Sequence, residues 1–232
     1  MNETNAIYTE ALGKVFREFW ALQSVNLEVP VGAIYALVGP NGAGKTTLIK
    51  ILMNIFRASV GKASVLGIPS TAIAGKAFTA IGYVSENQEL PEWMRVGQFL
   101  RYLAKFYPTW DKQLEVDLAK QFDLPLDRKL KHLSRGMRMK AALASALVFH
   151  PKLIVLDEPF TGLDPLVRDQ LIESLLERAS ESTLFISSHD LAEIESFSSH
   201  LGYLDQGKLR LSEELSSLTD RFREVEVVRD SP

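Results

Sequence analysis

The chain has 232 residues, 46% of them hydrophobic and 24% charged, with a formal net charge of −3 and no cysteine. This composition argues against a disordered chain and a strongly basic nucleic-acid binder, and it excludes any disulfide or thiolate metal site. The polar start "MNETNAIYTE" lacks the features of a signal peptide, and no apolar run approaches the ~18 residues of a membrane helix. We therefore expect a soluble, cytoplasmic chain with no nucleic-acid partner.

Short apolar runs alternate with helical patterns along most of the chain. The runs predicted as buried strands are "AIYALVG" (33–39), "AIGYV" (80–84), "KLIVLDE" (152–158), "STLFISS" (182–188) and "HLGYLD" (200–205). Such alternation is typical of a parallel α/β sheet.

The pattern changes between residues 90 and 132. There, "VGQFLRYLAKFY" and "DKQLEVDLAKQFDL" predict two amphipathic helices with no strand between them. We interpret this region as an inserted helical subdomain. After Gly207, the sequence predicts a strand, a short helix and a charged tail.

A glycine-rich motif, "GPNGAGKT", stands between the apolar strand "IYALV" and the helical "TTLIKILMN". It matches G-x-x-x-x-G-K-[ST], in which backbone N–H groups cradle phosphates, the lysine adds a cation and the threonine hydroxyl reaches Mg²⁺. The motif predicts a nucleoside triphosphate site with contacts from Gly39, Pro40, Asn41, Gly42, Ala43, Gly44, Lys45, Thr46 and Thr47.

Two carboxylates end the buried strand "LIVLDEP", residues 153–159. In open α/β sheets ligands bind at the carboxyl ends of the strands, so both acids should lie beside the phosphates. Asp157 is expected to hold Mg²⁺ through its water shell, and Glu158 to accept a proton from an attacking water.

The stretch "HLSRGMRMK" (132–140) predicts a helix start, with Ser134 as its N-cap and Gly136 in its first turn. Arg135, Arg138 and Lys140 add positive charge to the helix dipole, and no acidic residue stands beside them in sequence. This excess of positive potential predicts an anion at the N-terminus of the helix.

The ordered set of motifs resembles the ATP-binding subunit of ABC transporters over most of the chain. The resemblance implies an α/β fold: a P-loop NTPase core with a mainly parallel sheet, an N-terminal antiparallel β part and the inserted helical subdomain. It implies one ATPase domain over residues 1–232, with 1–89 and 133–212 as the catalytic core, 90–132 as the helical subdomain and 213–232 as a C-terminal extension. The family's Walker A, Q-loop, signature, Walker B, D-loop and H-loop fall on Gly39–Thr46, "YVSENQ", Leu133–Met137, Leu153–Glu158, Gly162–Asp164 and His189.

The same resemblance implies roles in the hydrolysis of ATP. His189 would contact the γ-phosphate and order the attacking water with Glu158, while Lys45 would act on the phosphates. ABC ATPases pair head to tail, so Ser134 and Gly136 of one chain would close over the nucleotide that the other chain holds. Asp164 is also expected at the nucleotide.

Two motifs depart from the family pattern. The usual signature is Leu-Ser-Gly-Gly-Gln, whereas this chain has Arg135 and Met137 at the first glycine and the glutamine. The usual Q-loop glutamine position holds Glu86, with Gln88 two residues further on. We assign Glu86 to the Mg²⁺ site and leave both residues open as the acting one.

In the family, an aromatic residue of an early strand stacks on the adenine. The register of "LGKVFREFWAL" favours Phe16, with Phe19 and Trp20 as competitors. The alternative is that all three rings belong to the core.

The resemblance also implies a function. We expect an ATP hydrolase that forms a homodimer and drives a separate transmembrane permease of the export type at the inner face of the cell membrane. Apolar residues after the Q-loop (Leu90, Trp93, Met94 and Phe99) predict the permease contact, although each could instead be core. The alternatives are a non-transport ABC ATPase in translation or DNA repair, and a small-molecule kinase.

Overall fold

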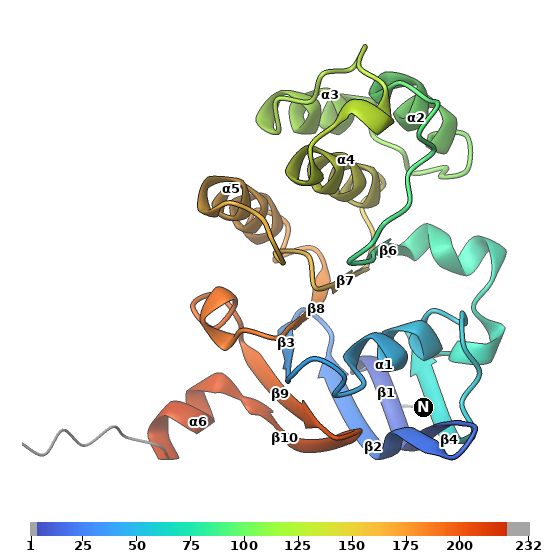
Figure 1. The fold of residues 1–232 in the computed structure, drawn as a ribbon, viewed down its shortest axis with the longest axis vertical. Coiled ribbons are helices and arrows are strands. Elements are labelled where there is room, and N and C mark those ends of the chain that lie inside the picture. Colours follow the sequence, from blue (N-terminus) through green and yellow to red (C-terminus); the bar gives the residue numbers. More distant parts are fainter. Residues whose placement is uncertain (1–3, 222–232) are drawn as a thin grey trace, which may run out of the picture.

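A computed structural model describes residues 4–221 and contains two sheets (Figure 1). The antiparallel sheet has the order β2-β1-β4-β5, and the six-stranded sheet has the order β10-β9-β3-β8-β7-β6. The first contains β1 (Asn5–Phe16), β2 (Phe19–Pro30), β4 (Val60–Val65) and β5 (Ile68–Pro69). The second contains β3 (Ile34–Val38), β6 (Ile81–Val84), β7 (Leu153–Asp157), β8 (Thr183–Ser188), β9 (His200–Asp205) and β10 (Lys208–Glu214).

The six-stranded sheet is parallel except for its edge strand β10, which pairs antiparallel with β9. Every residue of β7 and β8 is buried, which explains why the aliphatic and aromatic residues within each strand are consecutive rather than alternating with polar ones. The five strands predicted from such runs are confirmed, with ends within one residue of the predicted ones.

Three α-helices begin at a side-chain cap. Asp111, Ser134 and Asp164 each accept a backbone N–H from the first turn of the helix that follows them. The helices are α1 (Lys45–Leu52), α2 (Val96–Leu103), α3 (Lys112–Gln121), α4 (Arg135–Leu147), α5 (Pro165–Leu176) and α6 (Leu215–Arg221). The tail predicted after α6 lies outside the described residues.

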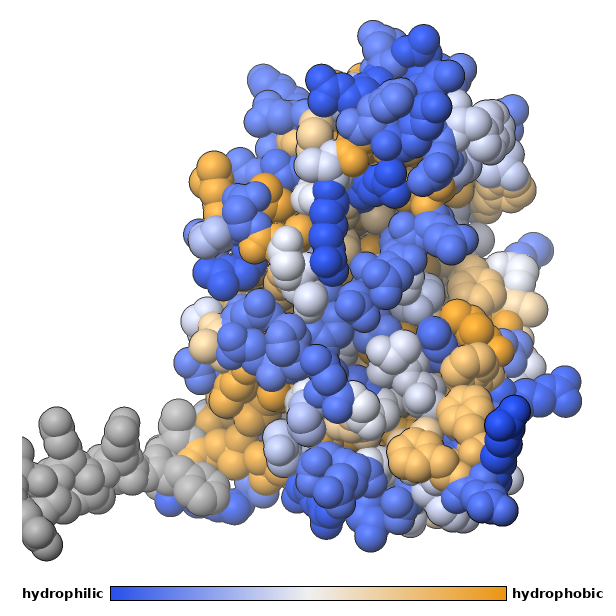
Figure 2. Space-filling view, in the orientation of Figure 1, coloured by the Kyte–Doolittle hydropathy of each residue, from blue (hydrophilic) through white to orange (hydrophobic). Residues whose placement is uncertain are grey.

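Figure 1 shows α2, α3 and α4 together at one end of the molecule, away from α1 and the antiparallel sheet. Hydrophilic residues cover most of the face that Figure 2 presents. Within residues 4–221, no helix has the length and apolar character needed to cross a membrane.

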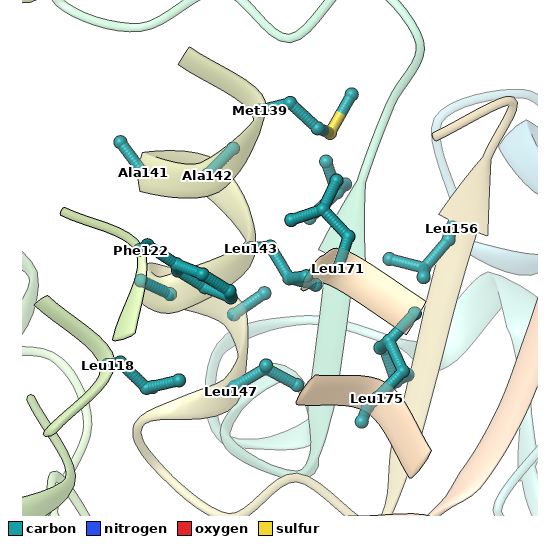
Figure 3. Close-up of a cluster of buried hydrophobic side chains, with 14 of the residues drawn as sticks. Leu118, Phe122, Met139, Ala141, Ala142, Leu143, Leu147, Leu156, Leu171 and Leu175 are labelled. Carbon is teal, nitrogen blue, oxygen red and sulfur yellow. The ribbon is translucent and has the colours of Figure 1, made fainter. Parts of the chain in front are cut away.

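Two hydrophobic clusters form the core. One lies between α1 and the two sheets, and the other joins α2, α3, α4 and α5 to the opposite face of the six-stranded sheet. In Figure 3, Leu143 and Leu147 of α4 lie between Leu118 of α3 and Leu171 of α5. Because α4 packs on both sides, its N-terminus is held in a defined place relative to the sheet.

The carboxyl ends of β3, β7 and β8 meet at one edge of the sheet. In the parallel register, Asp157 pairs with Ser187 and Val38 pairs with Ser188. The glycine-rich loop therefore follows β3 at the edge where Asp157, Glu158 and His189 emerge from the neighbouring strands. This edge carries the candidate site.

Candidate active site

The glycine-rich loop leads into α1 without a side-chain cap. Gly42 and Gly44 have φ angles of +82° and +111°, which residues with a Cβ rarely adopt. Gly44 is the N-cap of α1 and makes no side-chain hydrogen bond, so the first N–H groups of the helix are left for an anion. The Lys45 ammonium folds back and donates to the carbonyl oxygens of Gly39 and Pro40, at 2.5 and 3.2 Å.

Glu158 lies at the centre of the site and is almost fully buried. Its Oε1 lies 3.0 Å from Lys45 Nζ, and its Oε2 lies 2.8 Å from His189 Nδ1. Thr161 Oγ1 also donates to Oε2, at 3.0 Å. The carboxylate therefore supplies the negative charge beside Lys45.

These contacts change the proton affinities of Glu158 and His189. Burial alone would raise the pKa of Glu158, but the hydrogen bonds from His189 and Lys45 outweigh burial and hold it below its ordinary value. The hydrogen bond to Glu158 raises the pKa of His189. While Lys45 is paired with it, Glu158 is a poor proton acceptor.

Asp157 lies beside the start of α1 and is 1% exposed. Its Oδ1 accepts from Thr46 Oγ1 at 3.1 Å and from Ser187 Oγ at 2.7 Å. Burial raises the pKa of Asp157 despite these two donors, and the charge of Glu158 raises it further.

Thr46 and Asp157 fit a magnesium ion bound together with phosphates. Mg²⁺ uses hard oxygen ligands, keeps several waters and takes only one or two protein carboxylates in such sites. The described residues contain no cluster of three or more His, Cys, Asp or Glu side chains suited to a metal. The threonine hydroxyl and the carboxylate, completed by phosphate oxygens, match this donor set.

Replacing Asp157 with asparagine should raise the melting temperature of the nucleotide-free protein. The asparagine Oδ1 keeps both hydroxyl donors, while the buried charge beside Glu158 disappears. Because the pKa of Asp157 is higher in the folded chain than in the unfolded chain, its ionised form costs stability at neutral pH. That cost shrinks as the pH falls through the folded-state pKa. For a chain of this size, about 1 kcal/mol shifts Tm by about 2–4 °C.

Thermal unfolding near neutral pH should therefore show a gain of a few degrees for Asp157→Asn, and a smaller gain in mildly acidic buffer. Asp190→Asn is the matched control, because Asp190 is exposed and its asparagine can still accept the Ala192 N–H. A lower Tm for Asp157→Asn than for the control would contradict a destabilising buried charge.

A cleft of about 370 Å³ opens over the glycine-rich loop. A larger cleft, of about 830 Å³, lies at the start of β7 and β8 and contains none of the predicted site residues. The smaller cleft is lined by Phe16, Phe19, Ala21, Asn41, Gly42, Ala43, Gly44, Lys45, Thr46, Thr47, Glu86 and Glu158.

The two candidates for the Q-loop residue, Glu86 and Gln88, differ in whether they line this cleft. Glu86 lines it, whereas the side-chain oxygen of Gln88 accepts from the backbone N–H and the hydroxyl of Ser85, both at 3.1 Å. Gln88 is therefore occupied by a local turn, and Glu86 is the one that faces the glycine-rich loop.

Phe16 and Phe19 both line the cleft, and Trp20 does not. The alternative that all three rings are core is wrong, because they are 41%, 66% and 43% exposed respectively. The Phe16 ring packs edge-on against Phe56, with the Lys14 ammonium 4.9 Å from its centroid.

The signature residues lie outside this cleft. Ser134 Oγ accepts the Met137 N–H at 3.2 Å, which confirms the predicted N-cap of α4, and Ser134 itself is exposed. A Cβ on Gly136 would contact Val167 of α5, and Asp164 caps α5 by accepting the Val167 N–H at 3.1 Å. Thus Ser134, Gly136 and Asp164 do not share a cleft with the glycine-rich loop of their own chain.

Sequence reasoning missed several partners of the site. It selected His189 from the segment "SSHD" but not Ser187, which bonds Asp157, nor Ser188, which bonds Glu193 at 2.8 Å. It also missed Glu92, whose carboxylate lies 3.6 Å from Arg138 and supplies an acidic partner from a distant part of the chain. No local motif signals the contacts of Ser187 and Glu92, because they join residues that lie far apart in sequence.

Comparison with known proteins identifies relatives of this site and fold. A family model described as ABC transporter matches residues 22–161. The chain is 36% identical to an uncharacterized ABC transporter ATP-binding protein of Nostoc sp., over 94% of this chain and 69% of that protein. It is 34% identical to the Nod factor export ATP-binding protein I of Neorhizobium galegae, over 89% of this chain and 61% of that protein. A solved ATP-binding subunit of an ABC transporter has a TM-score of 0.84 at 26% identity, covering 93% of this chain and 92% of that one.

Proposed function

This chain belongs to the ABC transporter family as an ATP-binding and ATP-hydrolysing subunit, and we propose that two copies pair head to tail around two ATP molecules. In this scheme the dimer drives a separate transmembrane permease of the export type. The family membership comes from the sequence match.

One observation supports the pairing above the others. The α4 N-terminus is exposed, carries Ser134 and Gly136, and lies outside the cleft that its own glycine-rich loop forms. Among the described residues, the Arg135 guanidinium beside it makes no ion pair. A helix N-terminus with added positive charge favours an anion, and a triphosphate held by a second chain would supply one.

ATP binding would rearrange the contacts around Glu158. The Lys45 ammonium would leave Glu158 for the β- and γ-phosphates, which raises the proton affinity of the carboxylate. Glu158 would then accept the proton of the attacking water, while His189 contacts the γ-phosphate. Thr46 and Asp157 would hold Mg²⁺, with Glu86 nearby, and the ion would neutralise charge that develops on the phosphates. Phe16 or Phe19 would stack on the base.

The export assignment has two supports. The Neorhizobium galegae relative is named as an export ATP-binding protein. The altered signature and Q-loop also resemble the export branch more than nutrient importers. A role in translation or DNA repair is the competing function, but this chain has one P-loop and a helical subdomain of ordinary length.

The burial of the four apolar residues after the Q-loop shows which of them is free to contact a permease. Leu90, Met94 and Phe99 are buried, so they are core residues, whereas Trp93 is 70% exposed. A cleft of about 660 Å³ lies between residues 86–92 and the start of α4, and Trp93 is the next residue in sequence after Glu92, which lines this cleft. We therefore assign the contact to Trp93 and this cleft.

Affinity-tagged chain in detergent extracts of its source cells should bring down a membrane-spanning subunit, and Trp93→Glu should lose that subunit while still binding ATP. A carboxylate at this exposed apolar position would oppose an apolar partner without disturbing the core. Mass spectrometry of the captured proteins and a nucleotide-binding assay make the measurement.

Val116→Glu is the matched control, because Val116 is 59% exposed on α3. Capture of ribosomes or DNA instead of a membrane-spanning subunit would favour the competing function. Loss of ATP binding in Trp93→Glu would show that Trp93 serves the fold instead of the contact.

A further inference from the structure

The Ser187 side chain joins the two acidic residues at the end of β7. Its hydroxyl donates to Asp157 Oδ1 at 2.7 Å and accepts the Glu158 backbone N–H at 3.0 Å. A serine hydroxyl has one proton, so donation to Asp157 leaves its lone pairs for the Glu158 amide. Ser187 is 0% exposed and is the register partner of Asp157 between β7 and β8. One buried hydroxyl thus contacts both residues.

Asp157 and Glu158 are adjacent in sequence, but their carboxylates contact different partners, so the backbone between them has to turn. Asp157 ends β7 and faces Thr46, whereas Glu158 faces Lys45 and His189. Glu158 has a φ of +51°, a left-handed conformation that is unfavourable for a residue with a side chain. Its amide reaches both the Ser187 hydroxyl and the Ser187 carbonyl, the latter at 3.2 Å. Ser187 therefore anchors the turn that separates the two carboxylates.

We propose that Ser187 is a positioning residue for ATP hydrolysis, whose hydroxyl orients Asp157 for its cation and holds the turn that aims Glu158 at the attacking water. This inference rests on the roles proposed above for Asp157 and Glu158. Thr46 Oγ1 donates to the same Asp157 oxygen from α1, so that oxygen is held from two elements. Removing Ser187 Oγ leaves Asp157 with one of these two donors and the Glu158 amide with the backbone acceptor alone.

Two nearby serines show what a purely structural hydroxyl does. Ser182, just before β8, donates to the Pro151 carbonyl at 2.6 Å and is also buried. Ser188 bonds Asp190 and Glu193 in the loop after β8. Neither hydroxyl bonds Asp157 or Glu158. Ser182 is the better control, because about five strand residues, roughly 16 Å, separate it from Ser187.

The test compares Ser187→Ala with Ser182→Ala. A fluorescent ATP analogue is titrated into each protein in EDTA and in Mg²⁺, and kcat for ATP is measured over a series of Mg²⁺ concentrations. A hydrogen bond to a charged group corresponds to about tenfold or more in an equilibrium constant. Mg²⁺ should increase the affinity of Ser187→Ala for the ATP analogue about tenfold less than it increases that of the wild type. The variant should also need about tenfold more Mg²⁺ for half-maximal turnover, and its kcat should be lower. Its affinity in EDTA should match that of the wild type.

Ser182→Ala should keep the wild-type gain from Mg²⁺, even if both variants melt at a lower temperature. If Ser187→Ala does not fold, Ser187→Cys replaces it, because a thiol is a weak donor of similar size. Equal Mg²⁺ dependence in the wild type and the Ser187 variant would overturn the proposal while leaving Asp157 in its role. No Mg²⁺ dependence in the wild type would overturn both the role of Asp157 and that of Ser187.

Discussion

Glu158→Gln should bind ATP and hydrolyse it about 10²–10⁴-fold more slowly than the wild type, which is the range that a general base contributes. Glutamine keeps the shape of the side chain but cannot take a proton from the attacking water. The substitution also removes the charge that pairs with Lys45 and His189. Lys45 is then free to meet the phosphates, so ATP affinity should be kept or increased.

The measurement combines single-turnover hydrolysis with size-exclusion chromatography in ATP. Glu158→Gln should accumulate as a dimer with two trapped ATP molecules, because the closed dimer forms but does not hydrolyse its ATP. Glu193→Gln is the matched control, since the Glu193 carboxylate accepts from the Ser188 hydroxyl, whereas the carboxylate that pairs with Lys45 is that of Glu158. Its turnover should stay within a few-fold of the wild type. Near-normal turnover in Glu158→Gln would exclude Glu158 as the base.

Much of the central sheet could be predicted because its strands are buried on both faces. In the run "LIVLD" of β7, four aliphatic residues precede the terminal Asp157, and the observed strand is Leu153–Asp157. The start of a helix could also be predicted where a capping side chain marks it, as Ser134 does for α4. In both cases the signal is local in sequence.

The N-terminal hairpin had no such local signal and was expected only from the family resemblance. The register of β1 against β2 shifts at several points, and Ala11 and Ser24 have positive φ angles. Each shift changes the face to which the following side chains point, so the alternating pattern of a half-buried strand is broken. The ends of α2 and α3 were also predicted too long, because Phe122 and Leu124 continue the apolar pattern of α3 as loop residues packed into the core.

Some residues of the candidate site could likewise be predicted from local motifs, and others could not. The residues of the glycine-rich loop and the two carboxylates were predicted from motifs with a known mechanism. The choice between Glu86 and Gln88 was not, because it depends on a hydrogen bond from Ser85 that fixes Gln88 in a turn. The contact of Ser187 with Asp157 requires the β7–β8 register, which joins residues 30 positions apart.

Lys45→Ala and Gly136→Asp should each abolish ATP hydrolysis by the homodimer, for different reasons. Lys45→Ala removes the cation that serves the phosphates, whereas the aspartate at position 136 sets a carboxylate against the γ-phosphate. Each head-to-tail dimer would have two composite sites, each using Lys45 from one chain and Gly136 from the other. In a mixed dimer, one site carries both lesions and the other carries neither.

Three controls make this comparison interpretable. Gly136→Ala tests sterics alone, because a Cβ at this position lies 3.3 Å from a Val167 methyl group. Thermal unfolding of Lys45→Ala tests stability, because the substitution leaves Glu158 without its lysine partner. A heterodimer of wild type with Lys45→Ala tests whether one intact site can turn over by itself.

The ATPase rate of the mixed Lys45→Ala and Gly136→Asp heterodimer, isolated with two different tags, tests the head-to-tail site most directly. We expect activity to reappear, at a rate similar to that of the wild-type and Lys45→Ala heterodimer, because one wild-type loop then faces one wild-type signature. An inactive mixed heterodimer beside an active control heterodimer would contradict the head-to-tail pairing.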